Sequence, residues 1–215
     1  MSSSLNFSTS EHLTTTSRII AAIGSPLGSV YAPSEDSFLM LQALSNLDLR
    51  DRTVCDVGTG SGILGLFCGL RGAGEIIVTD INELALRETV NAAGRLGIKV
   101  EPILSDLLSG LDNRFDLILF NPPYLPSEEV VDRSIDGGPK GLLLIRRFLE
   151  DLPNHLNQNG HALLLLSSLN NPEVVISDYN KFAFQKSATR RVFFEELQVL
   201  DLRLRDNLMG KRFDR

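Results

Sequence analysis

Residues 54–62 read VCDVGTGSG. The apolar segment 53–58 has strand character, and it leads directly into a turn that carries Gly58, Gly60 and Gly62 before a helical segment of small residues. In an open parallel sheet the ligand lies beyond the carboxyl ends of the strands, and a glycine-rich turn lets the backbone approach it closely. The stretch therefore predicts an α/β fold with a ligand at this turn.

The chain after this turn alternates between strand-like and helical segments. Further strands are expected at 75–80, 98–106, 115–120 and 161–168, helices at 81–97, 141–156 and 171–182, and two strand-like runs within 187–206. Alternation of this kind is typical of a parallel sheet covered by helices on both faces. The closely joined final pair favours an antiparallel hairpin, so we expect a doubly wound, Rossmann-like sheet of seven strands.

The bulk properties limit the classes of function. The 215 residues are 43% hydrophobic with a net charge of −6, and residues 30–215 are expected to form a single domain. Residues 1–29 are polar and are expected to be partly disordered, with a short helix at 18–24 and no secretory signal. Two cysteines in apolar surroundings, Cys55 and Cys68, indicate a reduced, cytoplasmic protein without a metal site. No segment approaches the ~20 apolar residues that a membrane span requires.

The charge is unevenly distributed along the chain. From Lys181 to the C-terminus there are 9 Lys and Arg residues against 5 Asp and Glu residues. This tail could contact RNA, or it could simply be a solvated charged surface, and both interpretations remain open. The acidic remainder of the chain argues against general nucleic-acid binding.

Acidic residues around the glycine turn indicate the kind of cofactor. Asp80 ends the second strand, 20 residues after Gly60, where a carboxylate can accept hydrogen bonds from ribose hydroxyls. The dinucleotide pattern would need a glycine where Ile63 stands, and no Lys or Arg is available for a pyrophosphate. An acidic turn that includes Asp56 suits a cationic ligand such as S-adenosylmethionine. The alternative is a turn that only packs a helix closely on a strand.

Asp106 lies just after the third predicted strand, in the segment SDLL. Its carboxylate could accept the exocyclic amine of adenine while Leu107 contacts the ring, or it could serve as a helix cap. Position alone favours neither role.

The segment LFNPPYLP, residues 119–126, ends the fourth predicted strand. The side-chain oxygen of Asn121 and the backbone carbonyl of Pro122 can each accept a hydrogen bond, and Tyr124 offers a flat surface for stacking. Together they would clamp a planar, conjugated amine, either a base amine or the amide of glutamine. Catalysis would come mainly from orientation, without a dedicated general base. The alternative is a proline-stiffened turn.

Several segments together resemble the class I S-adenosylmethionine-dependent methyltransferases that carry an NPPY motif: VCDVGTGSG, VTDIN, SDLL and FDLILFNPPY. Two more, SVYAPSEDSFLMLQAL and SIDGGPKGLLLIRRFLE, resemble the HemK-like release-factor glutamine methyltransferases. The resemblance covers residues 30–168. It implies a lid over the cofactor from Tyr31, Pro33 and Glu35, and a rim beside the substrate from Gly137, Gly138 and Gly141. The complete set of candidate cofactor contacts is Tyr31, Pro33, Glu35, Asp56, Gly58, Thr59, Gly60, Asp80, Ile81, Asp106, Leu107 and Asn121, and that of the substrate clamp is Asn121, Pro122 and Tyr124.

About 30 residues precede the similar region, so the chain resembles the short archaeal and eukaryotic form of this family. That form associates with a small zinc-binding activator protein. The resemblance implies methylation of a glutamine amide, most plausibly in a translation release factor. Two alternatives remain: methylation of an exocyclic amine in RNA or DNA, and a cofactor-binding subunit without catalysis.

Overall fold

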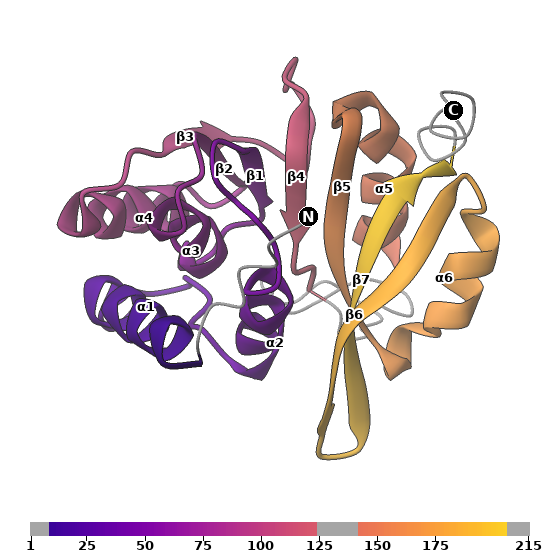
Figure 1. Ribbon diagram of the computed structural model, residues 1–215, viewed down its shortest axis with the longest axis horizontal. Coiled ribbons are helices and arrows are strands. Elements are labelled where there is room, and N and C mark those ends of the chain that lie inside the picture. The colour runs from indigo at the N-terminus through magenta and orange to yellow at the C-terminus, as the bar shows by residue number, and fades with distance from the viewer. Residues whose placement is uncertain (1–8, 124–141, 206–215) are drawn as a thin grey trace, which may run out of the picture.

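The computed structural model describes residues 9–123 and 142–205 (Figure 1). The helices are α1 (Thr9–Ile23), α2 (Glu35–Leu44), α3 (Ile63–Leu70), α4 (Glu83–Leu96), α5 (Leu143–His155) and α6 (Pro172–Asp178). The strands are β1 (Thr53–Val57), β2 (Glu75–Asp80), β3 (Glu101–Leu104), β4 (Phe115–Phe120), β5 (Leu156–Ser167), β6 (Phe182–Val192) and β7 (Glu195–Leu204). Among these residues, no helix has the length and apolar character to span a bilayer.

The strands form one sheet in the order β3-β2-β1-β4-β5-β7-β6. The first five strands of this order are parallel, and β7 runs antiparallel to both β5 and β6. This confirms the predicted doubly wound sheet with an antiparallel terminal hairpin. The strand order changes direction between β1 and β4, which is where ligands bind in open sheets of this kind.

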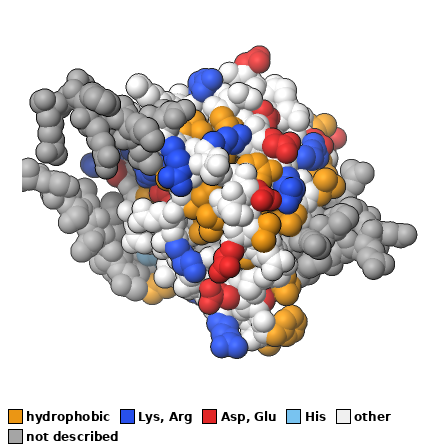
Figure 2. Space-filling model, turned by 90° about the vertical axis from the view of Figure 1, so that its right-hand side faces the viewer, with side chains coloured by type: hydrophobic (Ala, Val, Ile, Leu, Met, Phe, Trp, Pro, Cys, Tyr) orange, Lys and Arg blue, Asp and Glu red, His pale blue; other side chains and the backbone are white. Residues whose placement is uncertain are grey.

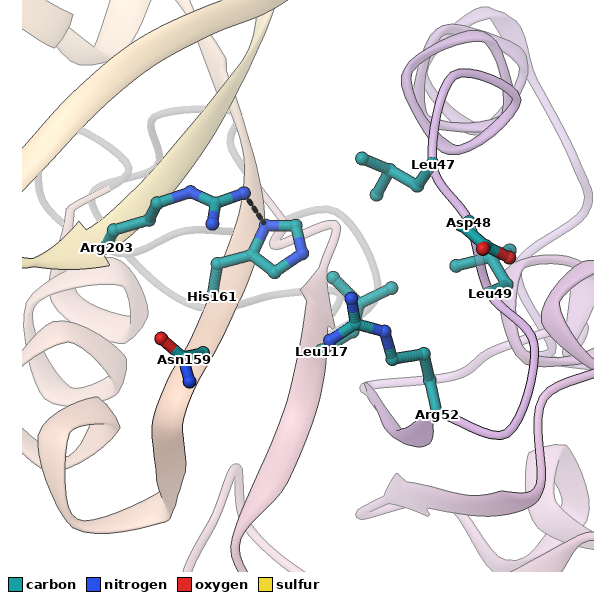
Figure 3. A pocket seen from close by; sticks show the side chains of 8 residues that line it. All are labelled: Leu47, Asp48, Leu49, Arg52, Leu117, Asn159, His161 and Arg203. Carbon is teal, nitrogen blue, oxygen red and sulfur yellow. Dashed lines mark hydrogen bonds between the residues drawn. The ribbon is translucent and has the colours of Figure 1, made fainter. Parts of the chain in front are cut away.

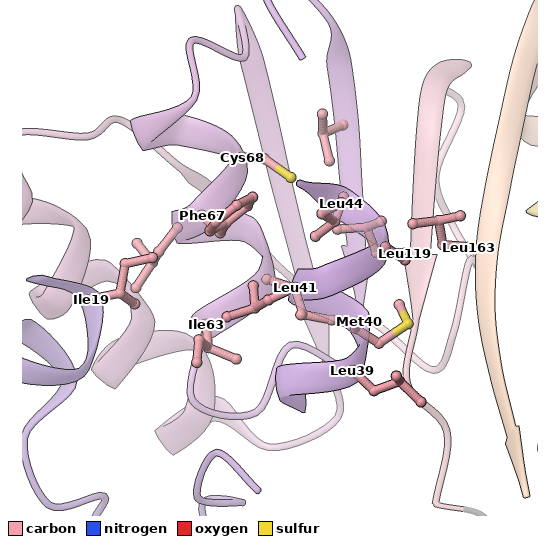
Figure 4. Close-up of a cluster of buried hydrophobic side chains, with 14 of the residues drawn as sticks. Ile19, Leu39, Met40, Leu41, Leu44, Ile63, Phe67, Cys68, Leu119 and Leu163 are labelled. Carbon is pink, nitrogen blue, oxygen red and sulfur yellow. The ribbon is translucent and has the colours of Figure 1, made fainter. Parts of the chain in front are cut away.

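Alternating side chains of the central strands feed two separate cores. Leu117, Leu119 and Leu163 point to the face covered by α1 to α4, whereas Ile118 and Phe120 point to the face covered by α5 and α6. Figure 4 shows the first core, in which residues of α1, α2 and α3 meet those of β4 and β5. The second core fixes the end of β4, because the Phe120 ring packs on Phe148 with 4.6 Å between centroids. The sheet therefore provides a rigid base for the residues that follow Phe120.

The structure differs from the predicted elements in three places. Helix α1 begins at Thr9 rather than at residue 18. Helix α6 ends at Asp178 rather than at residue 182, and β6 begins at Phe182, before the predicted strand-like runs at 187–206. Strand β5 begins at Leu156 rather than 161, so the Asn159-Gly160 pair lies inside a strand and not in a turn. A register shift between Phe115 and Leu117 marks an irregularity of the β4–β5 pairing at this point.

Candidate active site

The glycine turn joins β1 to α3 and is tied to the end of β2. The amide of Gly60 donates to Asp80 Oδ2 over 2.9 Å, and the amide of Asn82 donates to Asp80 Oδ1 over 2.9 Å. Burial raises the pKa of Asp80 although these amides lower it. Each carboxylate oxygen retains a further lone pair, so Asp80 can still accept hydrogen bonds from a ligand.

Two glycines of the turn are required for different reasons. Gly62 has a φ of 82°, and a Cβ there would lie 2.6 Å from Cγ2 of Thr89, so it serves the packing of α3 against α4. Gly60 has a φ of 54°, and a Cβ there would lie 3.4 Å from Cβ of Tyr31. Gly60 therefore keeps open the narrow space between the turn and the loop that precedes α2.

Asp56 supports the turn from below. Its Oδ2 accepts the Thr59 hydroxyl over 2.7 Å and the Gly65 amide over 3.0 Å, and the side chain is buried. Burial raises the pKa of Asp56 to about 6 despite these two hydrogen bonds. Thr59 is also buried, and its amide donates to the Thr79 carbonyl over 2.9 Å. The structure thus gives both residues a part in shaping the turn.

The loop before α2 lies against the turn, as a lid would. Tyr31 approaches Gly60, and the Asn82 side chain donates to Ser29 Oγ over 3.1 Å. Pro33 is half-buried in this loop. Glu35 is exposed and forms an ion pair with Arg190 of β6, so the structure gives this predicted cofactor contact a partner in the terminal hairpin.

The predicted adenine contacts lie beyond β2 and β3. Ile81 is exposed next to Asp80. Leu107 lies in the turn after β3 and has a φ of 59°, which is uncommon for a residue other than glycine. Asp106 is exposed and forms a 2.9 Å ion pair with Arg147 of α5. A ligand amine at Asp106 would share this carboxylate with Arg147.

At the end of β4, Asn121 meets a residue from the start of α2. The Asn121 amide nitrogen donates to Asp36 Oδ2 over 3.1 Å, and the Tyr31 hydroxyl donates to the same oxygen over 2.8 Å. Asp36 is only 3% exposed, and its Oδ1 accepts the Ser37 hydroxyl over 3.2 Å. We name Tyr31, Asp36 and Asn121 the carboxyl-end cluster, because it lies at the carboxyl ends of the parallel strands.

Asp36 determines which atom Asn121 presents. A carboxylate oxygen can only accept, so the atom of Asn121 that faces it must be the NH2 group. The other atom, Asn121 Oδ1, is buried and has no hydrogen-bond partner among the described residues. A buried acceptor without a partner is costly and rare, and such atoms concentrate at functional sites. The side chain of Asn121 is therefore oriented with an oxygen that can accept a hydrogen bond from a ligand.

Asp36 is the functional residue that sequence reasoning missed. Ser34 is the N-cap of α2, and Asp36 stands in the first turn of this helix. The available signal was an acidic residue in the first turn of a helix that follows the lid loop. Its contact with Asn121 bridges 85 residues of sequence.

Pro122 is buried directly after Asn121. Tyr124 and the three rim glycines lie outside the described residues.

A second polar cluster lies at the opposite end of the sheet. His161 Nδ1 lies 2.9 Å from Asp201 Oδ1, and Arg203 donates to Asp201 Oδ2 over 3.1 Å. Burial alone would raise the pKa of Asp201, but the contacts with His161 and Arg203 hold it below the usual value. We name these three residues the amino-end cluster, since His161 pairs with Leu117 near the start of β4.

Two residues of the amino-end cluster, His161 and Arg203, line a cavity of about 100 Å³ (Figure 3). The other lining residues are Leu47, Asp48, Leu49, Arg52, Leu117 and Asn159. None of the predicted site residues lines this cavity, so it is separate from the candidate active site.

The residues at the carboxyl ends of β1, β2 and β4 fit a nucleoside-type cofactor. Gly60 allows the positive φ that the turn requires, Asp80 offers acceptor lone pairs for hydroxyl groups, and Asn121 Oδ1 has no hydrogen-bond partner among residues 9–123 and 142–205. A doubly wound sheet with this site defines a Rossmann-like methyltransferase.

The chain belongs to the Methyltransferase small domain family, which matches residues 34–189, and it is an enzyme of the HemK-like class I group. A provisionally named protein N5-glutamine methyltransferase from Methanocaldococcus jannaschii is 35% identical over 80% of this chain and 90% of its own length. Methyltransferase HEMK2 of Mus musculus is 34% identical over 80% of this chain and 88% of its own length.

A solved structure shares the fold over nearly its whole length. It is a chain of the E. cuniculi Mtq2–Trm112 complex, described as responsible for methylation of the eRF1 translation termination factor. The TM-score is 0.67 at 25% sequence identity, and the match covers 82% of this chain and 99% of that one.

Proposed function

We propose that this enzyme transfers a methyl group from S-adenosylmethionine to the side-chain amide nitrogen of a glutamine, in a translation release factor. The observation that carries the proposal is the buried Oδ1 of Asn121, which has no hydrogen-bond partner in the described part of the chain and belongs to a side chain held by Asp36. The relatives named for glutamine methylation support the same substrate class.

The chemistry needs orientation more than activation. A glutamine amide has two N–H groups: Asn121 Oδ1 would accept one, and the Pro122 carbonyl would accept the other. The nitrogen is a weak nucleophile because its lone pair is delocalised, so fixing it in line with the methyl group is the main contribution. The bound cofactor supplies the methyl group on a positively charged sulfur. Transfer would break the bond between that sulfur and the methyl carbon, and the sulfur would leave as a neutral thioether. Asn121 Oδ1 and the Pro122 carbonyl would stabilise the positive charge that develops on the amide nitrogen until one N–H proton leaves to water.

We assign the cofactor's ribose to Asp80 and its adenine to the neighbourhood of Ile81, Asp106 and Leu107. Tyr31 and Pro33 would cover the cofactor as a lid, and the Tyr31 hydroxyl would connect that lid to the clamp through Asp36. Because Asp36 contacts both Tyr31 and Asn121, cofactor binding and substrate orientation share one carboxylate.

We also propose a small zinc-binding activator as a partner and a cytoplasmic location. The related E. cuniculi complex supports the partner. Edge strand β3 exposes Leu104, which provides an apolar contact beside the sheet edge for it. Two buried free thiols, Cys55 and Cys68, are in keeping with a reducing compartment.

The test is transfer of radiolabelled methyl from S-adenosylmethionine, with and without the co-expressed activator. The substrates are a release factor with an exposed Gly-Gly-Gln loop, the same factor with that glutamine replaced by alanine, and unmodified RNA and DNA. We expect label only on the factor that retains the glutamine. Label on nucleic acid and not on protein would overturn the proposal in favour of the base-amine alternative.

A further inference from the structure

The hairpin formed by β6 and β7 ends in an unusual turn. Val192 pairs with Glu195, so Phe193 and Phe194 alone make the turn. Two-residue turns of antiparallel hairpins favour Gly, Asn or Asp, because their first residue needs a positive φ. Phe193 takes this position with a φ of 52°. A bulky residue in this conformation is strained, and strain of this kind is found mainly at functional sites.

The same two residues also break the usual rule of burial. Phe193 is 92% exposed and Phe194 is 88% exposed, more than any other large hydrophobic residue in the described part of the chain. In Figure 2, hydrophobic side chains appear at the lower end of the molecule, where the hairpin ends. A turn that is both strained and apolar serves neither local stability nor solubility. Two such departures at one position point to a role in contact with another molecule.

The hairpin turn lies at the same end of the sheet as Asn121, beyond the carboxyl ends of the parallel strands. Phe120 is level with Leu164 of β5, and Ser167 is level with Leu197 of β7, so the turn extends roughly 10 Å beyond the carboxyl end of β5. The hairpin is held there by polar contacts: Arg190 with Glu35, Glu195 with Ser167, and the Glu196 amide with Ser168 Oγ. It is therefore a braced projection next to the first turn of α2, which carries Asp36.

The charges of the hairpin favour a protein partner over a nucleic acid. Strand β6 carries three basic residues. Arg190 pairs with Glu35, Lys186 lies 3.8 Å from Glu196, and Arg191 stands opposite Glu196 in the β6–β7 register, so each basic residue has an acidic neighbour within the chain. Acidic residues Glu195 and Glu196 directly follow the two phenylalanines. Phosphate groups would meet this mixture of charges unfavourably, whereas an apolar side chain on a folded protein would bury the two rings.

We propose that Phe193 and Phe194 form a docking contact for the folded protein that carries the target glutamine. This inference rests on the proposed function and extends it. The clamp at Asn121 recognises only the amide, and the hairpin turn engages the body of the same substrate protein at a second point. Two separated contacts would let the enzyme select a glutamine by the protein that carries it. A short peptide would reach only the clamp at Asn121 and would not contact the hairpin turn.

The test replaces the turn with residues that suit it, Phe193→Gly together with Phe194→Ser. We expect an unchanged or higher melting temperature, because strain and exposed apolar surface are removed. The KM for the folded substrate protein should rise tenfold or more, while kcat and the transfer to a short glutamine peptide stay unchanged. A simple loss of structure would lower the melting temperature and both transfers together. The control is Leu13→Ser on α1, which also removes an exposed apolar side chain but lies in a different element from the hairpin. This variant should leave every KM unchanged.

Three results would overturn this inference. An unchanged KM for the folded protein would show that the turn does not dock it. An equal loss with the short peptide would place the effect in the clamp. Weaker transfer to RNA, with protein transfer unaffected, would identify a base-stacking surface instead. If the parent enzyme labels neither the glutamine protein nor the peptide, the proposed function fails first, and the docking contact falls with it.

Discussion

The carboxyl-end cluster and the amino-end cluster are both built on a buried aspartate at one end of the same sheet, yet only one leaves an atom unsatisfied. In the amino-end cluster, His161 and Arg203 occupy the two oxygens of Asp201. In the carboxyl-end cluster, Asp36 is likewise occupied, but its partner Asn121 keeps a buried oxygen without a partner among the described residues. We interpret the amino-end cluster as one that stabilises the fold, and we propose that the carboxyl-end cluster is prepared for a substrate.

The largest expected effect is on catalysis. Asn121→Ala removes the acceptor and should slow single-turnover methyl transfer by about 10²–10³, as when one preorganised hydrogen-bond partner of a transition state is lost. Cofactor affinity should stay near that of the parent, measured by calorimetry. Asn157→Ala is the matched control, because Asn157 also donates to an aspartate, Asp116, over 2.9 Å but lies away from the site. A parallel loss of cofactor binding together with a lower melting temperature would show that Asn121 is structural.

The amino-end cluster should respond in the opposite way. His161→Ala leaves Asp201 with Arg203 alone and should lower the free energy of unfolding by about 1–3 kcal/mol, the cost of a buried group that loses a partner. Methyl transfer below the melting temperature should not change. His161→Asn retains a donor near the position of Nδ1 and should recover part of the stability in urea titrations. A transfer rate that falls while stability is retained would remove the distinction between the clusters.

Asp80 tests whether the carboxyl end of the sheet binds the cofactor as well as the substrate. Asp80→Ala should weaken S-adenosylmethionine binding by about 1–3 kcal/mol through the lost charged hydrogen bonds. Its maximal transfer rate at saturating cofactor should fall much less than that of Asn121→Ala. Unchanged affinity in calorimetry would exclude Asp80 from the cofactor site.

The smallest expected effect is on the pH dependence of stability. Because the pKa of Asp56 is raised to about 6, the folded state holds a proton that the unfolded state has already released above pH 4. Stability from this group should therefore increase by about 1 kcal/mol as the pH falls from 7 to 5. Asp201, whose pKa is lowered, loses its contribution only at more acidic pH. Asp56→Asn should reduce the difference between pH 7 and 5, to which Asp80 also contributes because its pKa is raised, and an identical difference in the variant would refute the assignment.

Local sequence patterns predicted the sheet but not every element boundary. Polar, threonine-rich residues at the start of α1 are weak helix formers. The helix is fixed by distant contacts, the His12 ring on Phe67 and the Arg95 side chain on the Ala22 carbonyl. Gly160 was expected in the connection between the helix at 141–156 and the strand at 161–168, but it lies in β5, where a Cβ would come within 2.5 Å of the Phe115 carbonyl oxygen. Close approach of a neighbouring strand requires glycine just as a turn does.

The candidate site can be compared with the structure only in its arrangement, and its function stays a prediction. The glycine turn, Asp80 and the motif at Asn121 follow from short segments whose spacing carries the chemistry. The orientation of Asn121 could not be predicted, because it depends on Asp36 at the start of a different element. Likewise, the pairing of Glu35 with Arg190 and of Asp106 with Arg147 depends on the folded arrangement of elements.

The most direct test is a reciprocal exchange of the pair that orients the clamp. Asp36→Asn and Asn121→Asp each disturb the donor–acceptor match, whereas the double variant restores it with the roles reversed and still leaves an oxygen of residue 121 as acceptor. Single-turnover methyl transfer to the glutamine protein should be slow in both single variants and at least about fivefold faster in the double variant than in either, a coupling of the size expected for residues in contact. A double variant as slow as the combined losses of the two single variants would contradict the account.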